Sequence, residues 1–161
     1  MPDITFLGWV HTILGISAIS VGMYDIVKNK YFSVTRKISQ LYFWLTFFTA
    51  ITALNIYNQG GFGISHILAI FALAALFVGW MTETFDLAGK YTAHLFTLNF
   101  SSTFLFHLFP AIADSLRRLP LGNPIADSLT DPVILQSYAL LLVGFLGLLI
   151  YQLTLIRRGY F

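Results

Sequence analysis

Five long apolar stretches constrain this chain more than any other feature. Each is close to the roughly 20 residues that an α-helix needs to cross a bilayer. Only 10% of the 161 residues are charged, against about 25% in an average soluble domain. The sequence therefore predicts an all-α integral membrane bundle, a single domain with five transmembrane helices. We place the spans at residues 4–27, 38–57, 63–84, 92–112 and 132–156.

Lysine and arginine are distributed unevenly between the loops. If all five spans cross, seven of these residues share one side and two, Arg117 and Arg118, lie on the other. Cytoplasmic loops are enriched in lysine and arginine. We therefore expect an N-terminus outside and a C-terminus in the cytoplasm, in a bacterial inner membrane. The seven are Lys28, Lys30, Arg36, Lys37, Lys90, Arg157 and Arg158.

Composition narrows the partners and the chemistry. The basic residues are scattered in short loops, so no nucleic-acid partner is expected and the bilayer is the predicted surrounding. The chain has no cysteine, which excludes disulfides and thiolate metal sites. Histidine is then the only strong nitrogen ligand. We expect the acidic residues at the cytoplasmic ends of the spans to pair with nearby cations: Asp25, Glu83 and Asp86 with Lys28, Lys90 or Arg158.

Small residues form one stripe on the first span, and a histidine lies among them. Such stripes allow helices to approach closely in a membrane. An intramembrane ionisable residue marks a functional site by default. At 100° per residue, one face carries Gly8, His11, Gly15, Ala18, Gly22 and Asp25.

Three of the four histidines are predicted to lie in the outer half of the membrane. At 1.5 Å per residue, His11 is about 12 Å deep, His107 about 8–12 Å and His66 about 5 Å. His94 is expected near the cytoplasmic end of the fourth span. Thr103 lies one turn from His107, so we predict that it accepts the second N–H of that imidazole. Ser65 is predicted to do the same for His66.

The leading hypothesis is a b-type haem in the outer half of the membrane. His11 and His107 match best in depth as axial ligands, with His66 as a substitute for either. Gly15 would leave room beside His11 for a flat macrocycle, and Arg117 and Arg118 would pair with its propionates. The function would be electron transfer, between membrane quinol and a partner on the outer side.

Other functions fit the same residues. His11, His66 and His107 are also predicted as three ligands for copper or zinc. A protein with no cofactor would instead be a non-catalytic subunit that packs against a larger membrane complex, with each histidine hydrogen-bonded inside the bundle. A third function is a small transporter lined by the histidines. The chain has no Gly-rich phosphate loop, HExxH or GxSxG motif.

The chain resembles, over nearly its full length, a family of small bacterial membrane proteins known only as a domain of unknown function. His11 followed by Gly15 and Gly22 matches the family's first span. Residues 35–39 (TRKIS) lack the histidine that the family has before its second span, and residues 91–94 (YTAH) lack its arginines. The resemblance implies the architecture. In architecture alone, the chain is also similar to membrane cytochromes b.

Overall fold

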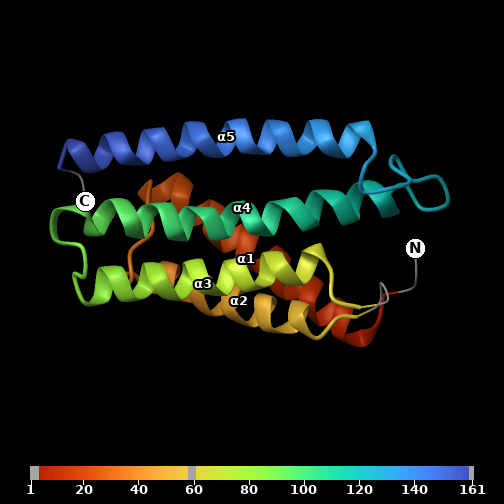
Figure 1. The fold of residues 1–161 in the computed structure, drawn as a ribbon, viewed down its shortest axis with the longest axis horizontal. Coiled ribbons are helices and arrows are strands. Elements are labelled where there is room, and N and C mark those ends of the chain that lie inside the picture. Colours follow the sequence, from red (N-terminus) through yellow and green to blue (C-terminus); the bar gives the residue numbers. More distant parts are fainter. Residues whose placement is uncertain (1–3, 58–60, 160–161) are drawn as a thin grey trace.

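The computed structural model describes residues 4–57 and 61–159, and it has one long helix at each predicted span (Figure 1). Four segments of the described chain are long and apolar enough to cross a membrane: α1, α3, α5 and the segment Gly89–Arg118. These four segments make the chain a multi-pass membrane protein with a helical bundle. The elements are α1 (Phe6–Asn29), α2 (Lys37–Leu54), α3 (Ile64–Thr84), the 3₁₀ turn η1 (Gly89–Tyr91), α4 (Thr92–Arg118) and α5 (Pro132–Arg157).

Two helix ends differ from the predicted spans by three residues or more, and the others agree to within two. The α2 helix ends at Leu54, three residues before residue 57, with Asn55 as its C-cap. The α4 helix continues through Pro110 to Arg118, six residues beyond the predicted end. Proline removes only one backbone donor, so a helix can run on where other contacts hold its last turns. Here the Arg118 Nε donates to Asp114 over 2.8 Å, and the Ala126 amide donates to the Leu116 carbonyl.

The α2 helix is not among the four segments that are long and apolar enough to cross a membrane. Its 18 residues rise about 27 Å, slightly less than the thickness of a hydrocarbon core. Several of its polar side chains, including Ser39, Thr46 and Thr49, are buried inside the bundle. Part of the polarity of α2 therefore faces protein, while Lys37 and Gln40 in its first turn are exposed.

The α4 helix lies at the centre of the arrangement. It packs along α3 and α5 and also contacts α1, while α2 packs between α1 and α3. Figure 1 shows α5 along one side of α4 and α2 and α3 along the other, with α1 crossing behind α4. Most of α5 is consequently exposed, and its only buried residues are Ile134 and Gln152.

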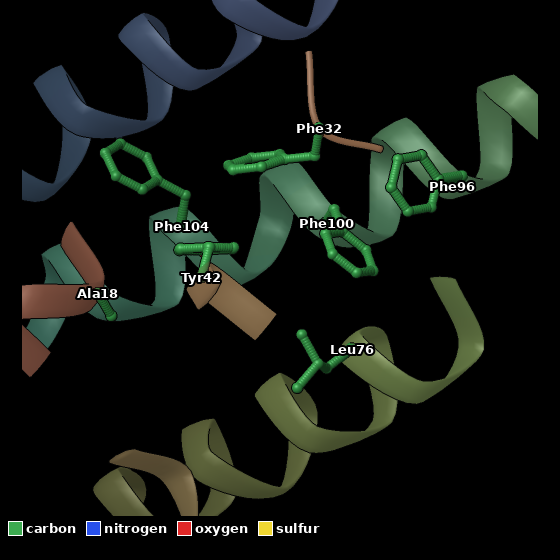
Figure 2. Close-up of a cluster of buried hydrophobic side chains, with 7 residues drawn as sticks. All are labelled: Ala18, Phe32, Tyr42, Leu76, Phe96, Phe100 and Phe104. Carbon is green, nitrogen blue, oxygen red and sulfur yellow. The ribbon is translucent and has the colours of Figure 1, made fainter. Parts of the chain in front are cut away.

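Aromatic side chains fill the core between these helices (Figure 2). Phe32 comes from the connection between α1 and α2, yet it is only 2% exposed. Its ring stacks on Tyr42, with centroids 4.6 Å apart. The connection is therefore anchored in the core by its own side chain. The cluster consists of Ala18, Phe32, Tyr42, Leu76, Phe96, Phe100 and Phe104.

Glycines permit the closest helix contacts. A Cβ atom added at Gly22 of α1 would lie 2.8 Å from the Tyr42 ring and 3.0 Å from the Phe104 ring. One added at Gly79 of α3 would lie 2.7 Å from the Phe100 ring. At Gly15 the nearest atom is the Thr49 methyl at 3.6 Å, an ordinary contact. The stripe predicted on α1 thus faces protein, and Gly22 is its tightest contact with other helices.

We expect Gly22→Leu to destabilise the protein far more than Ile16→Leu. The new side chain must displace the buried Tyr42 and Phe104 rings, and overpacking of this kind costs about 1–3 kcal/mol or more. Ile16 is 59% exposed and serves as the control. Gly15→Ala should be tolerated. Thermal unfolding in detergent measures all three, and equal Tm values for Gly22→Leu and Ile16→Leu would contradict the packing described here.

Candidate functional site

His11 and His107 reach the same helix from two different neighbours. The His11 Nδ1 atom of α1 lies 3.1 Å from the Thr49 carbonyl oxygen and 3.2 Å from Thr52 Oγ1. The His107 Nε2 atom of α4 lies 3.1 Å from Thr46 Oγ1. Thr46 and Thr49 are three residues apart, so they are neighbours on one face of α2. The structure therefore brings two of the predicted histidines to adjacent positions on α2.

The contact between His11 and the Thr49 carbonyl also indicates which ring nitrogen of His11 carries the hydrogen. A carbonyl oxygen only accepts hydrogen bonds, so Nδ1 must donate to Thr49. In the neutral imidazole, Nε2 then carries the free lone pair. A histidine that ligates a metal commonly donates its other N–H in this way.

Thr103 bonds to Tyr42 and not to His107, contrary to the prediction. Its hydroxyl donates to the Phe100 carbonyl over 2.7 Å. The Tyr42 hydroxyl, 2.7 Å away, must therefore donate to Thr103. His107 finds its partner on another helix, at Thr46. One-turn spacing along α4 suggested the wrong acceptor because it ignored the threonines that α2 buries against α4.

His66 lies apart from the other two histidines. Its Nδ1 accepts a hydrogen bond from the Gly63 amide, which caps the start of α3. Its ring packs against Tyr57 and Phe62, with centroids 4.8 Å and 5.0 Å away. Ser65, predicted to accept from His66, is exposed, and the bond that the structure shows runs the other way, with the Gly63 amide as donor. Within residues 4–57 and 61–159, no three His, Cys, Asp or Glu side chains are grouped to hold a metal ion.

Side chains lie next to both glycines that flank His11. The Thr49 methyl lies against Gly15, the position predicted to make room for a macrocycle. A Cβ at Gly8 would meet Ile4 at 2.8 Å. Two hollows, of about 490 Å³ and 380 Å³, lie elsewhere and neither is lined by a histidine. Arg118, predicted to bind a propionate, pairs with Asp114.

A second polar cluster lies at the opposite end of α1. Asp25 is completely buried and accepts hydrogen bonds from Arg36 Nη1 at 2.8 Å, Asn29 Nδ2 at 2.7 Å and the Ser39 hydroxyl. The expected partner, Lys28, donates instead to Tyr24. Sequence reasoning missed Arg36 because it lies in the connection that follows, eleven residues away. Asp25 on the buried stripe of α1 was the available signal.

Two more side chains bind the same connection. Glu83 of α3 accepts from the Val34 amide at 2.9 Å and the Ser33 hydroxyl at 3.1 Å, not from a cation as predicted. Asp86 was also predicted to pair with a cation, but it accepts a hydrogen bond from the Thr92 hydroxyl at the start of α4. Gln152 of α5 donates to the Lys30 carbonyl over 2.9 Å and accepts from Ser101 of α4. The connection between α1 and α2 is thus fixed by side chains from α3 and α5.

Comparisons of the chain with protein-family models, with curated proteins and with solved structures give no match. Its function must therefore be argued from its own residues.

Proposed function

We propose that all five helices cross a bacterial inner membrane, with the N-terminus outside and the C-terminus in the cytoplasm. The helices run alternately up and down the bundle in Figure 1, and α2 packs along both α1 and α3. Seven of the nine lysines and arginines then belong to one end of the bundle. The positive-inside rule makes that end cytoplasmic.

A reporter fused after Phe161 should be active in the cytoplasm and inactive outside it. A fusion in the connection at Asn123, between α4 and α5, should show the reverse pattern. Paired fusions to alkaline phosphatase and green fluorescent protein measure both. An external signal from the Phe161 fusion would contradict the five-span topology.

Within this topology, we infer that the protein is a non-catalytic subunit that packs with another membrane protein. The observation that carries this inference is the bonding of His11 and His107 to α2. Each imidazole has a partner inside the bundle, at Thr49 or Thr46, and the glycine positions beside His11 are filled by side chains. Interhelical hydrogen bonds of this kind hold helices in register in a membrane.

The exposed face of α5 is the surface that we assign to the partner. Leu140, Gly144, Gly147 and Tyr151 follow one another at helical spacing on this face, and all four are exposed. A Cβ atom at Gly144 or Gly147 would meet nothing within 4 Å. The occupant we propose is a transmembrane helix of another protein, because two open glycines allow a helix backbone to approach closely.

Gly144→Leu with Gly147→Leu should release the protein from its complex without unfolding it. We expect wild-type protein extracted in mild detergent to migrate well above the 18.1 kDa chain, and the double variant to migrate as the free chain. The matched control is Val143→Leu, an exposed neighbour. Size-exclusion chromatography with light scattering measures the mass. An unchanged complex in the double variant would contradict the assignment, and so would wild-type protein that already migrates as the free chain.

The second candidate function is haem-based electron transfer, with quinol as the donor. The arrangement of His11 favours it, because donation from Nδ1 to Thr49 leaves the Nε2 lone pair for iron. His107 would be the second axial ligand, after releasing Thr46, or His66 after releasing Gly63. Copper or zinc bound by these histidines is the variant of this candidate.

An absorption spectrum distinguishes the two functions. As a packing subunit, protein expressed with plentiful haem should be colourless, and His107→Ala or Thr46→Val should each lower the Tm. One such bond is worth about 0.6–2 kcal/mol. A haem protein should instead show a Soret band that His11→Ala and His107→Ala abolish or shift. His94→Ala is the control in both cases, since α4 holds it about 20 Å from His107.

A further inference from the structure

A basic hollow opens between the end of α1 and the start of α2. Its volume is about 490 Å³, and three of its seven lining residues are basic while none is acidic. The three basic residues are Lys28, near the end of α1, Arg36, directly before α2, and Lys37, the first residue of α2. The lining residues are Tyr24, Lys28, Asn29, Arg36, Lys37, Ile38 and Leu41.

The positive charge of this hollow is only partly compensated. Arg36 pairs with the buried Asp25. Lys28 is exposed and donates to the uncharged Tyr24 hydroxyl over 2.8 Å, and Lys37 is exposed as the first residue of α2. Asp25 and Glu83 are the acidic groups that interact with Arg36, so the charges of Lys28 and Lys37 remain for a ligand. Arg36 Nη1 donates to Asp25 and to the Tyr31 carbonyl, and the guanidinium lies over the Tyr31 ring at 5.1 Å from its centroid.

Apolar side chains line the same hollow on the α2 side. Ile38 and Leu41 follow Lys37 along the helix, and Leu41 is 48% exposed. Trp44, one turn further into the span, is 54% exposed. A ligand held by the basic residues would therefore extend an apolar part along α2 toward the membrane interior. A free inorganic anion would leave this part of the surface unused.

We propose that this hollow binds an anionic phospholipid, with its phosphate among Lys28, Arg36 and Lys37 and an acyl chain along Ile38 and Leu41. Basic pockets between transmembrane helices bind anionic headgroups at the cytoplasmic side. The first turn of α2 adds to the attraction, because its N-cap, Arg36, makes no side-chain capping bond and leaves backbone N–H groups for an anion. The site is separate from the α5 face assigned to a partner protein.

Lipid titrations of the full-length protein in detergent test this proposal. Phosphatidylglycerol should raise the Tm at lower concentration than phosphatidylcholine, which has a phosphate but no net charge. Inorganic phosphate and glycerol phosphate, which lack acyl chains, should not compete. Competition by either at similar concentration would overturn a lipid site and indicate a free-anion site. Equal effects of the two lipids would also overturn it.

Substitutions at the two uncompensated lysines locate the site. Lys28→Gln with Lys37→Gln should weaken the apparent affinity for phosphatidylglycerol roughly 25-fold, since each basic residue near an anionic surface contributes about a factor of five. The control pair, Lys90→Gln with Arg157→Gln, removes the same charge from exposed positions at the same end and should change little. Equal losses in the two pairs would reduce the effect to general surface charge and overturn the proposal. Should the first pair fold poorly, Lys37→Gln alone against Lys90→Gln gives the same comparison, with a loss of roughly fivefold.

Discussion

Hydrogen bonds from buried polar side chains to α2 hold the bundle together. In a hydrocarbon surrounding, a polar group without a partner costs several kcal/mol, so a partner within the protein is strongly favoured. The α2 helix supplies two such partners: the Thr49 carbonyl accepts from His11, and the Thr46 hydroxyl is hydrogen-bonded to His107. A helix with this many polar side chains is poorly suited to face lipid. Its polar side chains are shielded because α1 and α3 pack along it and α4 reaches it through His107 and Thr103.

The aromatic core and these hydrogen bonds depend on each other. Tyr42 is the residue that joins them: its ring stacks on Phe32, and its hydroxyl donates to Thr103. The same ring lies 2.8 Å from where a Cβ would stand at Gly22. The close approach of α1 and α2 therefore places the Tyr42 hydroxyl within reach of α4. Apolar packing in this bundle thus determines which polar groups can meet.

Periodicity and length in the sequence were sufficient to predict the helices, because twenty apolar residues in succession have few other ways to fold. The α1 stripe was also predicted correctly as a packing face, down to Gly22. The partners of the polar residues were not predictable in the same way. The three histidines His11, His66 and His107 have similar predicted depths in the membrane. Depth alone does not show which helices are neighbours, so it could not predict which histidines meet. To predict the partner of His107, one must know that Thr46 of α2 faces α4. To predict the partner of Asp25, one must know the path of the connection that follows α1.

That connection is more constrained than a surface loop usually is. Phe32 enters the core, Glu83 binds the Ser33 hydroxyl and the Val34 amide, and Gln152 binds the Lys30 carbonyl. Asp25 then fixes Arg36 and Ser39 at the start of α2. Side chains from α1, α3 and α5 thus hold about seven residues of backbone in one conformation. A binding site gains affinity when its groups need no ordering on association. The hollow beside Lys28 and Lys37 is built on this fixed backbone, so a phosphate bound there meets Arg36 and the first turn of α2 already in place. Only the two exposed lysine side chains remain to be ordered.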